Sequence, residues 1–466
     1  MTSESVKRWL RSPATIGFAL AFAAFLLVAL LQGEKPFYYD SGTYWSLGDT
    51  FSKGGSFSFA SFDSSLRGYS LPLLYLLLRE AGGIVTDNAS LLVMAFNSAV
   101  FALIGAVLGP RLATIAWPRL HWSVARRLVL CAVILFFWRG MLNYPLSDFP
   151  ALAAALMALV AISSYDSPRW MLVAGASAGL AVNARPAYLL LVPILLVLLG
   201  WGWRERRGSA DGAGWARAGA CGGLFLVALA LVWLPQSIAE HQRVGSYNPL
   251  PGGSALVGLQ YTEGLRLQRY DTYVGGGPEQ ARMMYRDPRG EEILAGLENE
   301  SVEGTGQYAG IVLDHPLTMA GVFLRHVVNG LDLRYPGGYI EQLQTGTNRI
   351  WRFAGFLLVF LAMLRVAWPT GRRSLEPARW RYPVALLLAC ATSIASAVEV
   401  RFMLPIFLLC ALIVVAPGWP SPLEAGPGLR RYRTLAIAAA AAVVFFAIVL
   451  TIVSGATDNL HLESAA

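Results

Sequence analysis

The chain contains few charged residues. Asp, Glu, Lys and Arg make up 14% of its 466 residues, whereas hydrophobic residues make up 55%. Soluble domains carry about 25% charged residues, so this composition excludes a soluble globular protein and predicts an integral membrane protein. The net charge of +8 does not indicate a nucleic-acid-binding protein, because the arginines occur in short clusters between apolar runs, as in the cytoplasmic loops of membrane proteins.

Cysteine and histidine are also scarce. His241, His315 and His326 lack the spacing of zinc ligands, and the run Gly275-Gly276-Gly277-Pro278 does not open a helix after a strand, as a dinucleotide-binding turn would. The sequence therefore predicts no cofactor. The cysteines all lie inside apolar runs, which predicts small buried side chains: Cys131, Cys221, Cys390 and Cys410.

Long apolar runs dominate the chain instead. A spanning helix needs about 20 apolar residues. The first run is long enough to span and shows no clear cleavage site, so we expect a retained helix and not a signal peptide. We predict eleven spans, over residues 13–32, 89–109, 127–142, 149–165, 170–184, 187–203, 217–236, 350–369, 382–398, 402–417 and 434–454.

The arginines predict the orientation of these spans. When the spans cross the membrane in alternate directions, five basic segments fall on one side of it. We predict this side, which also holds the N-terminus, to be cytoplasmic. The basic segments are residues 7–11, 111–127, 204–207, 372–381 and 430–433. The content of Ala, Arg and Gly is typical of a GC-rich bacterial genome, so we expect a multi-pass protein of the bacterial inner membrane.

Two long segments fall on the opposite side, and we predict them to be outer loops. The first, residues 32–88, contains an apolar stretch at residues 71–78 that is too short to span and predicts an interfacial helix. The second, residues 237–349, is mildly acidic and rich in Gly and Tyr. No internal repeat is found. We therefore expect an all-α polytopic fold with one membrane domain over residues 1–466.

Two acidic residues lie at the outer ends of predicted spans. Asp40 occurs in Phe37-Tyr38-Tyr39-Asp40-Ser41-Gly42-Thr43-Tyr44-Trp45, and Asp148 precedes Phe149-Pro150. A carboxylate beside the bilayer is costly unless a cation or a protic group meets it. Each is interpreted either as a functional group, with Asp40 a general base, or as a helix cap. Tyr44 shares a face with Asp40 if the segment is helical.

Arginines lie at the same outer junctions. Arg185 interrupts an apolar stretch, and membrane arginines usually pair with an anion; either a lipid phosphate or Asp148 fits. Glu399 and Arg401 are either an ion pair that joins two helices or a grip on a lipid phosphate. Arg67 is a further candidate anion contact. A divalent metal held by Asp40 and Asp148 is an alternative, but we favour a metal-free site.

Four stretches together resemble the GT-C superfamily of polyprenyl-phosphate-sugar-dependent glycosyltransferases, and are most similar to the branch of protein O-mannosyltransferases and lipid A aminoarabinose transferases. Asp40-Ser41-Gly42-Thr43-Tyr44 is similar to the family's first-loop Asp-Glu-x-x-Tyr element, with Ser41 in place of the second acid. Asp148 resembles the acid that opens the fourth helix. Glu399-Val400-Arg401-Phe402 is similar to a late Glu-x-Arg-Tyr element, with Phe402 in place of tyrosine. The fourth stretch, from Leu234-Pro235-Gln236 to Gly258, resembles the family's segment in which the chain leaves the membrane and enters the large outer loop.

This resemblance implies a GT-C fold and the inverting transfer of one sugar from a polyprenyl phosphate on the outer membrane face. Asp40 would deprotonate the hydroxyl of a glycan, lipid or protein acceptor. Tyr44, Asp148 and Arg67 would position the substrates, and Arg185, Arg401 and Glu399 would bind the lipid phosphate. Membrane lipids are the other expected partners. A flippase of lipid-linked glycans and a glycan ligase or polymerase using a lipid pyrophosphate remain alternatives.

Overall fold

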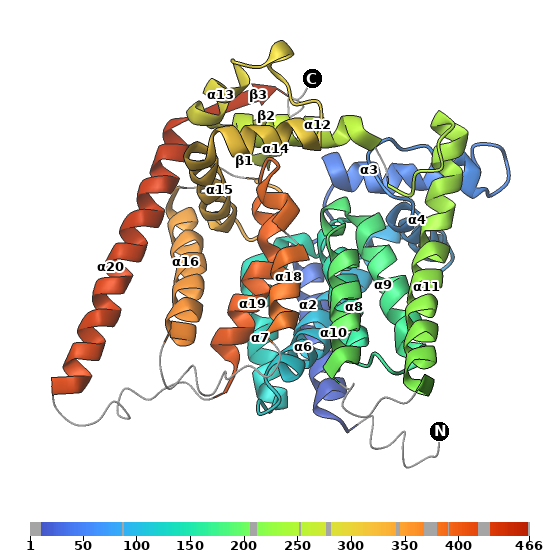
Figure 1. Cartoon of the computed structure of the whole chain (residues 1–466), viewed down its shortest axis with the longest axis horizontal. Coiled ribbons are helices and arrows are strands. Elements are labelled where there is room, and N and C mark those ends of the chain that lie inside the picture. Colours follow the sequence, from blue (N-terminus) through green and yellow to red (C-terminus); the bar gives the residue numbers. More distant parts are fainter. Residues whose placement is uncertain are drawn as a thin grey trace.

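The computed structural model describes residues 11–85, 88–205, 212–250, 253–275, 281–341, 345–367, 380–389, 391–417 and 429–464. The helices form a bundle, and a small sheet lies across one end of it (Figure 1). This end, which carries the three strands β1–β3, is called the sheet side below. The other bundle end lies near the start of α2. The helices of the bundle are α2 (Pro13–Gln32), α5 (Ala89–Ala102), α6 (Gly109–Ala116), α7 (Val124–Trp138), α8 (Asp148–Ile162), α9 (Pro168–Ala184), α10 (Leu191–Glu205), α11 (Gly212–Val244), α16 (Thr345–Ala367), α18 (Arg381–Ala389), α19 (Leu404–Val415) and α20 (Leu429–Asp458).

The protein is membrane-embedded, but the expectation of eleven spans is not confirmed. Each predicted span overlaps a helix. Within the described residues, however, only six helical segments are long and apolar enough to cross a membrane, or seven if a bent pair counts as one span. The other helices are short; α8 has 15 residues and α19 has 12. Helix α8 packs against α9, α5, α6 and α10 and most of its residues are buried, so it is surrounded largely by protein, where non-helical backbone beyond its ends is tolerated.

The sheet side is formed mainly by the two predicted outer loops. The first loop contributes α3 (Tyr39–Leu47) and α4 (Ser70–Val85). Helix α4 replaces the shorter predicted interfacial helix and packs against α5 and α3. Its Leu77 and Ile84 are 59% and 86% exposed, as expected for a helix that lies on a membrane surface. The second loop contributes α12 (Gly253–Arg266), α13 (Pro288–Leu294), α14 (Thr305–Asp314) and α15 (Pro316–Leu331).

The structure is mostly helical, in agreement with the all-α membrane expectation, and it adds one small three-stranded antiparallel sheet. The sheet consists of β1 (Leu267–Tyr273), β2 (Ala281–Arg286) and β3 (Leu460–Ser464), in that order. Tyr270 pairs with Met284, and Arg282 pairs with Glu463. The third strand follows α20, far along the chain from the other two. Local periodicity does not reveal such a pairing, because the partners become neighbours only once the helices are packed.

One pair of helices is sharply bent. Helices α14 and α15 meet at an angle of 111°, with His315 between them and Pro316 at the first position of α15. A helix thus starts directly after Asp314-His315. Proline suits this position because its missing N–H would have no partner in the first turn. Helix α15 packs against β1 and α20, so it joins the sheet to the bundle.

Several sequence features lie outside the described residues. They are Cys390, the glycines Gly276 and Gly277, residues 7–10, Arg206, Arg207, and the arginines of residues 372–379. The described cysteines Cys131, Cys221 and Cys410 are buried, as the sequence predicts.

Candidate functional site

Asp40 lies at the first turn of α3 and faces two arginines from distant parts of the chain. Arg67 follows the short helical turn η2 (Phe59–Ser61) in the first loop, and Arg401 belongs to the short helical turn η9 (Val400–Met403) before α19. Arg67 Nη2 contacts Asp40 Oδ1, and Arg401 Nη2 lies 2.6 Å from Asp40 Oδ2. The Asp40 side chain is 25% exposed. A substrate could therefore reach this carboxylate, whose charge is matched by two guanidinium groups.

Arg401 joins three carboxylates. Besides Asp40, its Nε donates to Glu399 Oε2, and its Nη1 lies 3.5 Å from Asp148 Oδ2. The Arg401 side chain is 8% exposed and that of Glu399 is 4% exposed. A planar guanidinium presents five N–H donors in a fixed geometry, so one arginine can bridge several acids. Arg401 is thus the centre of a buried ionic cluster.

Asp148 and Arg185 complete the cluster. Arg185 Nη1 contacts Asp148 Oδ1, and its guanidinium lies over the ring of Phe402, 4.1 Å from the centroid. The cluster therefore contains three carboxylates (Asp40, Asp148 and Glu399) and three guanidinium groups, those of Arg67, Arg185 and Arg401. A small pocket of about 230 Å³ adjoins it and is lined by Asp148, Arg185, Ala187, Tyr188, Ser393, Arg401 and Phe402.

The structure brings all six predicted charged residues together, and it excludes the helix-cap interpretation of both aspartates. The N-cap of α3 is Tyr38 and that of α8 is Ser147, and neither makes a side-chain capping hydrogen bond. Ser41, at the position of the family's second acid, is fully buried. Its Oγ donates to the Tyr38 carbonyl at 2.6 Å. A carboxylate at position 41 would meet that carbonyl oxygen without a proton to share.

The Tyr44 side chain supports the arginines. Helix α3 is formed as expected, and Tyr44 is buried. Its hydroxyl donates to the Ala184 carbonyl over 3.5 Å, and Arg67 lies over its ring, 5.5 Å from the centroid. Tyr44 therefore touches both the Arg67 side chain and the backbone that precedes Arg185.

The arginines dominate the electrostatics of Asp40. Burial raises the pKa of this carboxyl, but Arg401 and Arg67 outweigh burial and hold the pKa well below its usual range. Asp40 is therefore ionised at every physiological pH. An acid held so firmly in its charged form is also a weak proton acceptor as long as both arginines remain in contact with it.

A buried polar network connects the two chain segments that carry Arg67 and Arg185. Gln236 of α11 accepts a hydrogen bond from Tyr69 N at 3.0 Å and one from Asn183 Nδ2 at 3.2 Å. Asn183 Oδ1 accepts from Ser70 N at 2.9 Å. At Gly68 a Cβ would collide with the backbone oxygen of Asn183, so this close approach requires glycine.

We expect Gln236→Leu to destabilise the protein. The substitution leaves Tyr69 N–H and the Asn183 amide without their acceptor, and each unsatisfied buried donor costs about 1–3 kcal/mol. Thermal unfolding in detergent should show a lower midpoint, and hydrogen exchange should accelerate at residues 67–70. Gln268→Leu is the matched control, because Gln268 is equally buried but bonds to Arg286 and Asn329. Equal acceleration at residues 67–70 in both variants would contradict the role of Gln236.

Sequence reasoning missed two tyrosines at the site. Tyr270 of β1 lies beside Phe402, with ring centroids 6.3 Å apart, and its backbone N donates to the Val398 carbonyl. The Tyr339 hydroxyl contacts the backbone on both sides of Asp40. Both residues come from the second loop. Their only sequence signal is the abundance of tyrosine there, which does not single out either position.

The Arg401 guanidinium group would compete with a metal ion for Asp40 and Asp148. Arg401 contacts both carboxylates, so its guanidinium group takes oxygen atoms that a bridging metal would need. Among the described residues no group of three or more His, Cys, Asp or Glu side chains is placed to hold a metal ion.

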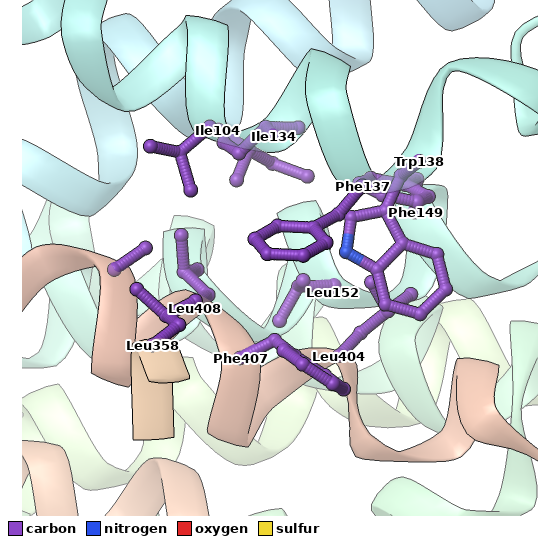
Figure 2. A pocket seen from close by; sticks show the side chains of 12 residues that line it. Ile104, Ile134, Phe137, Trp138, Phe149, Leu152, Leu358, Leu404, Phe407 and Leu408 are labelled. Carbon is purple, nitrogen blue, oxygen red and sulfur yellow. The ribbon is translucent and has the colours of Figure 1, made fainter. Parts of the chain in front are cut away.

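A second, wholly apolar pocket of about 320 Å³ lies in the bundle between α7, α8, α16 and α19. Figure 2 shows Ile104 and Ile134 on one side of it, and Leu404 and Phe407 on the other. Its lining includes Phe149, the residue after Asp148, and Leu404, three residues after Arg401. The ionic cluster and the apolar pocket are therefore connected through the starts of α8 and α19.

Comparisons with known proteins give no further identification. No family model, no curated protein and no solved structure matches the chain.

Proposed function

We propose that this protein is a glycosyltransferase of the bacterial inner membrane. It transfers a single sugar from a polyprenyl phosphate to an acceptor hydroxyl, with the sheet side facing the outside. The observation that carries the proposal is the partly exposed Asp40 carboxylate between Arg67 and Arg401. One candidate base and two phosphate-binding groups thereby meet at the end of an apolar bundle. The resemblance to the GT-C superfamily at Asp40, Asp148 and Glu399–Arg401 supports the same assignment.

The proposed reaction inverts the anomeric centre. Asp40 takes the proton of the acceptor hydroxyl, and the hydroxyl oxygen forms a bond to the anomeric carbon. The bond between that carbon and the phosphate oxygen breaks, and its electron pair leaves with the polyprenyl phosphate. Arg67, Arg185 and Arg401 are placed to stabilise the charge that develops on this phosphate. Phosphate is a good leaving group, so no general acid is required.

The lipid part of the donor would contact apolar side chains of the bundle, among them those that line the apolar pocket (Figure 2). A phosphate held by Arg185 and Arg401 would lie beside the first turns of α8 and α19, whose apolar side chains line the pocket. The free space inside this pocket is small, so the polyprenyl chain would lie mainly along the apolar surface of the bundle and among the membrane lipids. The proposal thus uses both the polar and the apolar part of the site.

Binding of the donor phosphate to the arginines would make Asp40 a stronger base. In the free protein Arg67 and Arg401 are both bonded to carboxylates. When the donor phosphate binds, it competes for the same guanidinium groups. Asp40 then loses part of the positive charge that depresses its pKa, and its pKa rises. Donor binding would therefore turn an inert carboxylate into an effective proton acceptor.

This exchange of arginine partners predicts a pH signature. The profile of kcat/KM reports the free protein, and that of kcat reports the substrate complex. Because Arg401 and Arg67 depress the pKa of Asp40 in the free protein, protonation of Asp40 should reduce kcat/KM only below about pH 4. The acid limb of kcat should lie at higher pH. Initial rates between pH 4 and 9 test this: kcat/KM should show no acid limb from Asp40 in that range, whereas kcat should fall at its acid end. A kcat profile without that fall would contradict the exchange.

The direct test of the function uses the purified protein in proteoliposomes. Polyprenyl phosphates carrying a pentose or a hexose are supplied with candidate lipid, peptide or glycan acceptors, and release of polyprenyl phosphate is measured. Release that depends on an acceptor supports the proposal. Movement of labelled lipid across the bilayer without release would establish the flippase, for which the bent pair α14–α15 is the favouring observation. Turnover of lipid pyrophosphates alone would establish the ligase or polymerase.

A further inference from the structure

A segment after α15 contacts both the end of the bundle and the start of α3. Residues 335–341, called the strap here, are held at both ends by backbone hydrogen bonds. Gly140 N donates to the Pro336 carbonyl at 2.8 Å, and Ile340 N donates to the Thr272 carbonyl at 2.9 Å. A Cβ at Gly140 would lie 2.8 Å from the Cα of Gly337, so a larger residue would push the strap away. The strap is therefore fixed independently of α3.

The backbone before Asp40 is strained. Tyr39 has a φ of 42°, in the left-handed region that a bulky residue rarely adopts. Such a conformation costs on the order of 1–3 kcal/mol and persists only where surrounding contacts enforce it. It occurs directly before the residue that we propose as the base. The contacts that enforce it therefore also determine where the Asp40 carboxylate points.

Tyr339 of the strap supplies such a contact. Its hydroxyl donates to the Tyr38 carbonyl at 2.8 Å and accepts a hydrogen bond from Ser41 N at 3.1 Å. These two groups lie immediately before Tyr39 and immediately after Asp40. Burial raises the pKa of Tyr339 to about 12, so the hydroxyl keeps the proton that it donates. One oxygen atom thus holds both ends of the strained turn.

We propose that Tyr339 is a positioning residue for Asp40. This inference rests on the proposed function. Its hydroxyl keeps the turn at Tyr39 and Asp40 in the conformation that directs the carboxylate at Arg67 and Arg401. The ring has a separate packing role against Tyr144, with centroids 4.8 Å apart. Removing only the hydroxyl therefore separates positioning from packing. The Tyr38 carbonyl also accepts hydrogen bonds from Ser41 Oγ, Ser41 N and Gly42 N, so the turn relaxes in that variant and does not unfold.

Tyr339→Phe tests the proposal in the full-length protein. We expect kcat to fall about 10- to 100-fold, as for a reacting group displaced by about 1 Å, with the donor KM changed less than about twofold. Hydrogen exchange at residues 38–44 should accelerate. Tyr335→Phe is the matched control, because it removes a hydroxyl from the same strap that bonds to Asn348. It should leave both readouts at the wild-type level.

A rescue variant distinguishes positioning from a general loss of stability. Glycine adopts positive φ without strain, so adding Tyr39→Gly to Tyr339→Phe should recover part of the lost kcat. Unchanged exchange at residues 38–44 in Tyr339→Phe, an equal effect of Tyr335→Phe, or no recovery with Tyr39→Gly would each overturn the proposal. The exchange measurement needs no turnover. If the wild-type protein transfers no sugar, the proposed function fails while the hold of Tyr339 on the turn is still tested.

Discussion

Asp40→Asn should lower kcat for sugar transfer by about 10²- to 10⁴-fold, the range that a positioned general base contributes. The amide has nearly the same shape as the carboxylate but cannot take the acceptor proton. Affinity for the donor should stay the same or increase. The cluster would change from neutral to a net charge of +1, and Arg401 would be held by two carboxylates instead of three. Steady-state kinetics in proteoliposomes would separate the two effects.

The control for this prediction is Asp49→Asn. Asp49 belongs to the same loop and also contacts an arginine, Arg79, but its side chain is 63% exposed and lies outside the cluster. That variant should transfer sugar at the wild-type rate. Full activity of Asp40→Asn would exclude Asp40 as the base. A higher donor KM with unchanged kcat would instead assign Asp40 to substrate binding.

The sequence allowed the charged members of the site to be predicted, because hydropathy limits where charges can lie. Asp40, Asp148, Arg185 and Arg401 each occur at a junction between apolar runs, and the alternating directions of the predicted spans placed these junctions on one side of the membrane. Charged groups at one bundle end pair with one another because leaving them unpaired near lipid is costly. The structure places them in one cluster. Their grouping could therefore be predicted from the cost of unpaired charges near lipid.

Other parts of the structure depend on contacts between distant segments. The strand β3 pairs with β2 only after α20 has brought it to the sheet side. Tyr339 reaches Asp40 across some 300 residues of chain, and no periodicity connects the two. The predicted number of spans is not confirmed, because an apolar run of 15 residues has the same composition whether it crosses lipid or lies inside a bundle. Tertiary packing decides such cases, and a single sequence does not encode it visibly.

Arg401→Gln should destabilise the protein by about 3–5 kcal/mol, the cost of breaking a buried ion pair from one side. Glu399, Asp148 and Asp40 would be left with two arginines, and neither Arg67 nor Arg185 is seen in contact with Glu399. Adding Glu399→Gln removes one buried negative charge and should restore much of the stability, which thermal unfolding in detergent would measure.

The same double variant decides between the two interpretations of this pair. If Glu399 and Arg401 only join two helices, restoring stability with two neutral side chains should also restore activity. If Arg401 binds the donor phosphate, the double variant should be folded and still lose transfer, with a donor KM raised by at least about tenfold, because a charge-assisted hydrogen bond to phosphate contributes about 1.5–3 kcal/mol. A stable double variant with wild-type kcat and KM would reduce Arg401 to a structural residue. Arg67 and Arg185 would then be the only cluster arginines left to bind the phosphate.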